Sequence, residues 1–247
     1  MMNLFHWITA SILAFFSAFF VDIAVATLPP GEYQHPCPHC GTTLHRFGLG
    51  YCTVCHKWVS MRFLVEFLFL FVGFLLISRE PTNTKVFWIN GLILVYLSII
   101  GFIDIETHLI QHKVTLFGLL LSIFLGSILH GYKSTFVGGG IAILLMGAFY
   151  LFGRWYAKIK NQRNTNGSDD TLDEALGFGD VTLAAIIGLL LGHAHILSAL
   201  VTGILLAGLY SLVIVIMMAV KKEFDPEKTI PYGPFLIIAA LVFLLPM

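Results

Sequence analysis

The sequence predicts an all-α integral membrane protein, a polytopic transmembrane helical bundle of about eight spans with one cysteine-rich loop. Two observations indicate this fold class. Of the 247 residues, 57% are hydrophobic and only 11% are charged, which is far from the composition of a soluble domain. Apolar runs of roughly 20 residues, the length that crosses a bilayer core of about 30 Å, recur along the whole chain.

The spans follow from these runs in chain order. We predict them at 4–26, 61–78, 86–103, 114–130, 135–156, 181–194, 196–220 and 232–246. The first run is too long for a removable signal peptide and lacks a small-residue cleavage site, so we expect it to remain as a helix. The break between the sixth and seventh runs is tight, and the count of eight depends on it. Three regions result: a first span (1–26), the cysteine-rich loop (27–60) and a membrane-embedded domain (61–247).

The positive charges are unevenly distributed between the loops. Eleven of the 14 Lys and Arg residues fall in the loops that follow the first, third, fifth and seventh spans, whereas the opposite loops carry only Arg79, Lys85 and Lys133. The positive-inside rule therefore places the odd loops in the cytoplasm and both termini outside. The net charge is zero and no basic patch is present. We therefore expect lipid around the chain and no nucleic-acid partner.

All four cysteines lie in one predicted cytoplasmic loop, as Cys37-x-x-Cys40 and Cys52-x-x-Cys55. Four thiolates in two such pairs suit a tetrahedral zinc ion. Disulfides or a redox dithiol are the alternative, but the cytoplasm is reducing, which favours zinc. The loop has little apolar material to bury, so a structural metal would supply its folding energy. Histidines crowd the same loop, and one of them could replace a thiolate.

Five carboxylates lie near span ends, all toward the predicted cytoplasmic face: Asp22, Glu66, Asp104, Glu106 and Asp180. An ionised carboxylate in mid-bilayer costs about 2.5–3.5 kcal/mol on insertion scales, so each of them calls for an explanation. Asp104 ends the third span, and Asp180 opens the sixth within the motif Gly-Phe-Gly-Asp, at the same depth. We expect these two to meet, and we assign no chemistry to Asp22 or Glu66.

Two close carboxylates share a proton, which leaves one base to activate water and one acid to protonate a leaving amine. The pair Asp104 and Asp180 therefore indicates an aspartic peptidase. Gly177 and Gly179 would allow a sharp bend and the close approach of an extended substrate, although a Gly-x-Gly alone is more often a plain turn. The helix dipole favours charge on Asp180 at a helix N-terminus and disfavours it on Asp104 at a C-terminus. Our hypothesis is that Asp180 is the base and Asp104 the acid.

These residues resemble those of the type IV prepilin peptidases, membrane aspartic peptidases of the GxGD type. The likeness covers nearly the whole chain and includes both cysteine pairs, Glu66 in WVSMRFLVEFL, Asp104 in DIETHLI, Asp180 in GFGDVTLAAIIGLLLG, and YGPFLIIAAL at 232–241. The resemblance implies that Asp104 and Asp180 are catalytic. It implies removal of a short basic leader from type IV pilins and pseudopilins, after a glycine, at the cytoplasmic face of the bacterial inner membrane. Many members then methylate the new N-terminus with S-adenosylmethionine.

The sequence departs from this pattern in two places. The family usually has Ile-Pro-Asp or Ile-Pro-Asn where this chain has Ile110-Gln111-His112. Two stretches of the cysteine-rich loop are shorter than usual in the family: the spacer Gly41 to Tyr51 between the cysteine pairs, and the stretch before Cys37. These differences weaken the expectation of N-methylation more than that of leader cleavage.

The sequence leaves open two other classes of function and the role of one loop. A proton-coupled transporter would also keep acids near the membrane, but it would favour a matched pair of interrupted helices, which is not evident. A non-catalytic assembly scaffold is the other alternative. The acidic stretch 169–174 is either a solvated linker or a means of attracting the basic leader toward Asp180.

Overall fold

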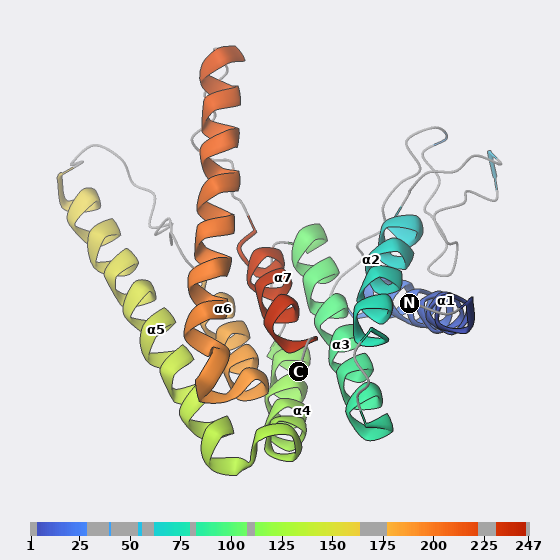
Figure 1. Cartoon of the computed structure of the whole chain (residues 1–247). Helices are drawn as coiled ribbons and strands as arrows, with labels where there is room; N and C mark the ends of the chain where they lie inside the picture. The colour runs from blue at the N-terminus through green and yellow to red at the C-terminus, as the bar shows by residue number, and fades with distance from the viewer. Residues whose placement is uncertain are drawn as a thin grey trace. The chain divides into compact units, whose positions relative to one another are not determined.

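The chain is a set of helices in the computed structural model of Figure 1. The structure describes residues 4–28, 40, 54–55, 62–79, 83–107, 112–163, 177–221 and 231–245. Within these residues it has seven helices and no strand, which confirms the all-helical prediction. The chain divides into two compact units, Met1–His108 with Leu245–Met247, and Leu109–Leu244, and each is described by itself.

The first unit contains α1 (Leu4–Thr27), α2 (Arg62–Ile77) and α3 (Thr84–Thr107), and each of the three contacts the other two. The buried face of α1 carries small side chains, Ala10, Ala14 and Ala18, spaced one helical turn apart. Its outward face carries large apolar side chains such as Phe16 and Phe20. Small residues inside and large apolar residues outside are typical of a helix that packs on other helices within lipid.

Helix α3 runs four residues beyond the predicted end of the third span at residue 103. Asp104 and Glu106 therefore belong to its last turn, whereas the sequence predicted Glu106 just beyond the helix. Half of the residues of α3 are buried, Ile93, Leu94 and Leu97 among them.

The second unit contains α4 (His112–His130), α5 (Tyr132–Arg163), α6 (Phe178–Lys221) and α7 (Gly233–Leu244). Helices α4 and α5 are joined at Gly131, whose φ of 77° suits glycine. Helix α5 lies antiparallel to the first part of α6, because Gly138 meets Gly188 at one end and Tyr150 meets Phe178 at the other. Helix α7 lies antiparallel to the second part of α6, where Tyr210 contacts Phe235 and His195 contacts Phe243.

Helix α6 is 44 residues long but is not continuous. A straight helix of that length would measure about 66 Å, twice the thickness of a bilayer core. The backbone leaves the helical conformation at Gly192, with φ 64° and ψ −173°. Figure 1 shows that the α6 ribbon changes direction along its length. The predicted break between the sixth and seventh spans therefore exists, three residues earlier than position 195. A left-handed φ strains residues with a β-carbon, which is why glycine occupies this position.

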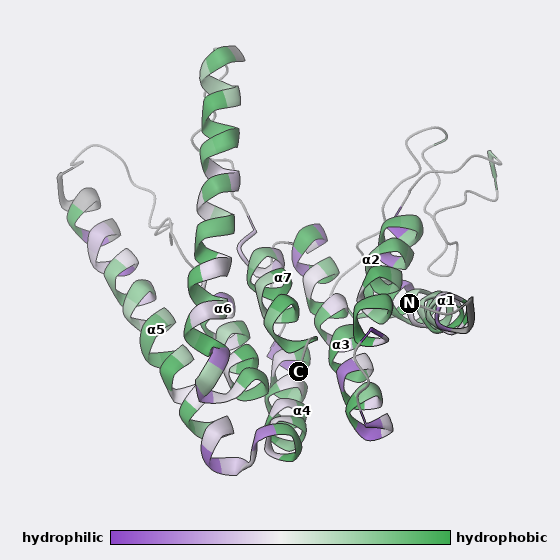
Figure 2. Ribbon diagram, viewed as in Figure 1, coloured by the Kyte–Doolittle hydropathy of each residue, from purple (hydrophilic) through white to green (hydrophobic). Residues whose placement is uncertain are grey.

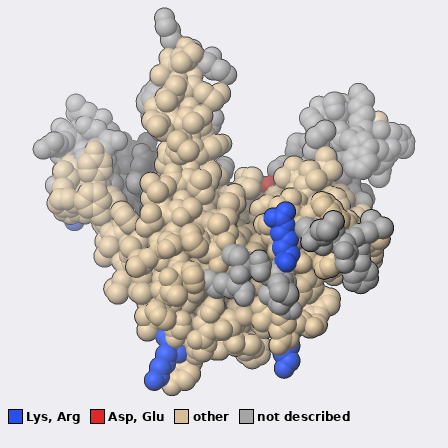
Figure 3. All heavy atoms as spheres, viewed as in Figure 1, with Lys and Arg blue, Asp and Glu red and all other residues tan. Residues whose placement is uncertain are grey.

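Five described helices are long and apolar enough to cross a membrane: α1, α3, α4, α5 and α6. Helices α2 and α7, of 16 and 12 residues, are shorter. The eight-span count remains a prediction. Apolar residues run along nearly the whole of the described helices in Figure 2, and few charged side chains appear on the face drawn in Figure 3. Such a surface suits a lipid environment.

Candidate active site

Asp180 lies in the first turn of α6, two residues after the helix begins at Phe178. Its backbone N–H donates to the carbonyl of Gly177 at 3.1 Å, and its side chain is half-buried. Thr182 donates its hydroxyl to the carbonyl of Gly179 at 2.8 Å, which tightens the same turn. The ring of Phe178 lies 6.1 Å from the ring of Tyr150 on α5 and anchors the start of the helix. The glycines thus form the entry into a helix, and the carboxylate is placed at its positive end.

Asp104 lies in the last turn of α3, and only 5% of it is exposed. The turn ends at Thr107, whose hydroxyl donates to the carbonyl of Ile103 at 2.8 Å. The two predicted catalytic acids thus belong to different units, Asp104 to the first and Asp180 to the second. Their approach to one another stays a prediction.

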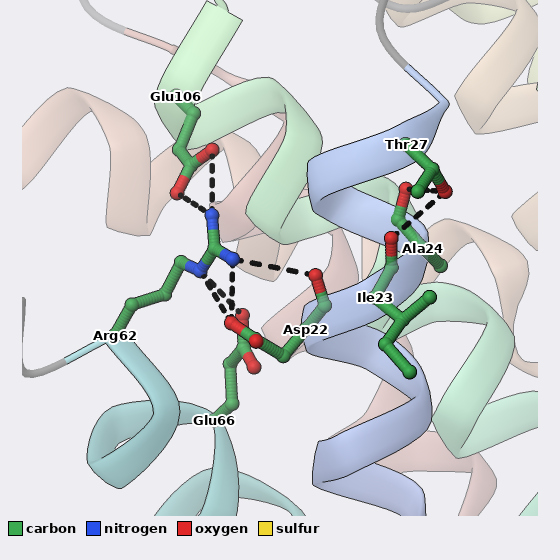
Figure 4. A network of polar contacts seen from close by, with 7 residues as sticks. All are labelled: Asp22, Ile23, Ala24, Thr27, Arg62, Glu66 and Glu106. Atoms are coloured by element: carbon green, nitrogen blue, oxygen red, sulfur yellow. Dashed lines mark hydrogen bonds and ion pairs between the residues drawn. The ribbon is translucent and has the colours of Figure 1, made fainter. Parts of the chain in front are cut away.

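A network of charges joins the three helices of the first unit, and Arg62 is at its centre (Figure 4). The guanidinium Nε donates to Asp22 Oδ1 at 2.8 Å, and Nη2 donates to the same oxygen at 2.5 Å. Nη2 also donates to the backbone carbonyl of Asp22 at 3.3 Å, and Nη1 donates to both oxygens of Glu106, at 3.0 and 3.3 Å. Arg62, the first residue of α2, thereby links the end of α1 to the last turn of α3.

Glu66 completes the network as a third carboxylate. It lies one turn after Arg62 on α2, and its Oε1 is 3.5 Å from Arg62 Nε. The side chain is fully buried, and neither of its oxygens accepts a hydrogen bond from the described residues. One guanidinium therefore faces three carboxylates, of which Asp22 and Glu106 take the hydrogen bonds.

The sequence did not predict the role of Arg62, which counted only as one positive charge of a cytoplasmic loop. The available signal was its spacing to Glu66, because residues four apart share one face of a helix. The partner of Asp22 was not predictable in this way, since it lies 40 positions further along the chain.

Residues 91–212 match the Type IV leader peptidase family. The chain belongs to the type IV leader peptidase family. The matched residues contain both Asp104 and Asp180, and they extend from α3 to the second part of α6. This confirms the family that the sequence motifs indicated.

Two relatives of this leader peptidase family member cover most of the chain. It is similar to a prepilin leader peptidase/N-methyltransferase of Pectobacterium carotovorum subsp. carotovorum, with 26% identity over 215 residues that cover 83% of this chain and 71% of the relative. It is also similar to a prepilin leader peptidase/N-methyltransferase of Aeromonas hydrophila, with 28% identity over 236 residues that cover 88% of this chain and 74% of the relative. No solved structure matches the chain.

Several predicted features of this family member fall wholly or partly outside the described residues. Of the predicted zinc ligands, Cys40 is described and exposed, and Cys55 is described and half-buried, whereas Cys37 and Cys52 lie outside. The acidic stretch 169–174 also lies outside. Within the described residues, no group of three or more His, Cys, Asp or Glu side chains could hold a metal ion. The zinc site therefore stays a prediction from the spacing of the cysteines.

Proposed function

We propose that the chain is a membrane-embedded aspartic endopeptidase that removes the basic leader of a type IV prepilin or pseudopilin. The observation that carries the proposal is membership of the type IV leader peptidase family, through a match that includes both Asp104 and Asp180. The relatives of this chain are prepilin leader peptidase/N-methyltransferases over more than four fifths of its length. We extend the peptidase activity of these relatives to this chain.

The positions of the two acids in their helices support the mechanism. Asp104 is in the last turn of one apolar helix and Asp180 in the first turn of another. In our orientation both helix ends face the cytoplasm, because the positive-inside rule puts the preceding or following loops there. A substrate helix held in the bilayer would then present the peptide bond next to it at this depth.

Hydrolysis by the pair proceeds through a water molecule held between the two side chains. We assign Asp180 as the ionised base, which takes a proton from the water as its oxygen attacks the carbonyl carbon of the scissile peptide bond. Asp104 is the protonated acid, which stabilises the developing negative charge on the carbonyl oxygen by a hydrogen bond and then transfers its one proton to the leaving amine. The proton that Asp180 took from the water restores the single proton that the pair shares. Low water content around a buried side chain such as Asp104 strengthens these interactions.

Zinc and S-adenosylmethionine belong to the proposal as separate groups. Four thiols in two Cys-x-x-Cys pairs form a donor set that fits zinc, so Cys37, Cys40, Cys52 and Cys55 would hold it. Zinc would stabilise the loop, and no step of peptide hydrolysis passes through it. S-adenosylmethionine would supply the methyl group for the new N-terminus of the cleaved substrate, and we assign no residue to its binding.

The test is leader cleavage by the purified full-length protein in detergent, with a leader-bearing prepilin and mass spectrometry of the products. We expect the wild-type protein to release the leader after a glycine. Asp104→Asn and Asp180→Asn should each lower the rate by about 10³-fold or more, because a dyad works as a unit. Asp225→Asn, a matched change at an acid to which we assign no role, should keep full activity.

A transporter or a scaffold would leave the prepilin intact, and so would a peptidase that acts on another class of substrate. If folded wild-type protein leaves the prepilin intact, the proposal is refuted. Full activity of either Asp→Asn variant would refute the two-aspartate mechanism alone. The same assay with S-adenosylmethionine tests methylation, which would add one methyl group to the product. Metal analysis of the purified protein and of Cys37→Ser tests zinc, and we expect one zinc per chain in the former and less in the latter.

A further inference from the structure

We propose that Arg62 is a positioning residue that holds Asp104 in place for peptide hydrolysis, acting through Glu106. The inference rests on the proposed function, because that function assigns Asp104 its catalytic role. It is carried by three observations on the first unit: the hydrogen bonds of Arg62, the two acids in the last turn of α3, and the burial of Asp104.

The last turn of α3 has an unfavourable arrangement of charge when it is considered alone. It carries Asp104 and Glu106, and no basic residue lies within it. The C-terminus of a helix bears a partial negative charge, so carboxylates there are disfavoured and cations are favoured. The compensating cation comes from another helix, because Nη1 of Arg62 donates to both oxygens of Glu106. Without this cation, we expect the turn that contains Asp104 to fray.

The geometry of Arg62 suits a clamp between helices. Its Nε and Nη2 donate to Asp22 on α1 and its Nη1 donates to Glu106 on α3, so the planar guanidinium fixes the two helix ends at a set separation. Asp22 is only 3% exposed, so its bonds to the guanidinium are shielded from solvent. A lysine cannot reproduce this arrangement, since one ammonium lacks the fork of donors that reaches two carboxylates.

The same contacts argue against a binding role for the network. Glu66 is fully buried beneath the guanidinium, and the guanidinium nitrogens already donate to Asp22 and Glu106. A basic group of a leader peptide would therefore have to displace Arg62 to reach Asp22 or Glu66, which are both buried. The network is better suited to fix the backbone of α3 than to receive a ligand.

A small movement of α3 would be enough to impair hydrolysis. A carboxylate carbon about 6 Å from a helix axis moves by about 1 Å when the helix turns by 10°, from the dimensions of an α-helix. A misplacement of about 1 Å costs on the order of 10²-fold in rate. We therefore expect Arg62→Gln to lower kcat by about 10- to 100-fold and to change KM by less than about threefold, because the substrate is still bound.

The experiment compares kcat and KM of full-length Arg62→Gln, Arg62→Lys, Glu106→Gln and the Arg62→Gln/Glu106→Gln double variant. We expect Arg62→Lys to recover part of the activity, and the double variant to be no slower than Arg62→Gln alone, since both changes break one interaction. Arg79→Gln is the matched control, because Arg79 is exposed in the turn at the other end of α2. A kcat of Arg62→Gln within twofold of the control, a loss confined to KM, or additive losses would overturn the proposal.

Hydrogen–deuterium exchange of the same proteins gives a readout that does not need activity. We expect faster exchange of residues 101–107 in Arg62→Gln than in Arg79→Gln, with any change in α1 confined to the turn around Asp22 and the rest of the first unit unchanged. Equal exchange in the two variants would overturn the clamp, and so would faster exchange throughout the unit. Wild-type protein that exchanges as expected but cleaves no prepilin would refute the proposed function instead, so the two failures are distinguishable.

Discussion

The close crossing of α5 and α6 depends on Gly188, and its replacement by alanine tests the packing of the second unit. A β-carbon at Gly188 would lie 2.6 Å from the carbonyl oxygen of Gly138 and 2.7 Å from Cβ of Ala142. Carbon atoms in contact prefer a separation of about 3.5–4.0 Å. Neither neighbouring atom can rotate away, because one belongs to the backbone and the other is bonded directly to it. The two helices would have to separate by about 1 Å.

Such overpacking costs about 1–3 kcal/mol. A change of 1 kcal/mol shifts the Tm of a protein of this size by about 2–4 °C, so Gly188→Ala should lower the Tm by between about 2 and 12 °C. The matched control is Gly208→Ala on the same helix, where an added β-carbon would meet nothing within 4 Å. Alanine has the higher helix propensity by about 1 kcal/mol, so the control should keep or raise the Tm.

The assay is thermal unfolding of the purified protein in one detergent, followed by intrinsic fluorescence. The double variant Gly188→Ala/Ala142→Gly removes one of the two contacts, although Ala142→Gly by itself costs about 1 kcal/mol in helix propensity. The loss in the double variant should therefore be smaller than the sum of the losses in the two single variants. Equal shifts for Gly188→Ala and Gly208→Ala would refute the close crossing, and so would strictly additive losses in the double variant.

Four further changes address the kink and the charge network, each measured by Tm in the same assay. Gly192→Ala should cost about 1–2 kcal/mol, because a left-handed φ strains alanine. The β-carbon of the new alanine would also lie 2.5 Å from Ser134 Oγ. An unchanged Tm would contradict the φ at the kink. Ser134→Ala should cost about 1–3 kcal/mol, at about 0.5–1.5 kcal/mol for each hydrogen bond, because it removes two of them: the 2.9 Å bond to His193 Nδ1 and the 3.3 Å bond that the backbone N–H of His193 donates to Ser134 Oγ. A larger loss would indicate a further role. Glu66→Gln should stay within about 1 kcal/mol of wild type, since it replaces a buried charge that accepts no hydrogen bond from the part of the chain that the structure describes. Asp22→Asn should cost more, because it weakens two hydrogen bonds from Arg62. The reverse order would show that Glu66 is the main partner of Arg62.

The helices and the place of the two acids within them were predictable from the sequence, because both are local properties. An apolar run predicts a helix wherever it is long enough, so the predicted spans agree with α1 to α5 and α7 within a few residues at most boundaries. The largest departure is α5, which continues to Arg163 because its basic C-terminal turns can remain helical after the apolar run ends at 156. Asp180 was expected at the start of its helix for the same local reason, since Gly-Phe-Gly directly precedes the apolar run.

The partners of these side chains were decided only by tertiary structure. Arg62 and Asp22 are 40 positions apart, Arg62 and Glu106 are 44 apart, and no periodicity relates them. The sequence could mark Asp22, Glu66 and Glu106 as unusual acids, because charge near an apolar run is costly, but it could not say which cation compensates them. In the same way, Gly188 and Gly138 were recognisable as small residues, while their contact depends on how α5 and α6 cross. Span length and charge cost are properties of one segment, whereas a hydrogen bond or a close helix crossing requires two segments to meet, and packing alone brings them together.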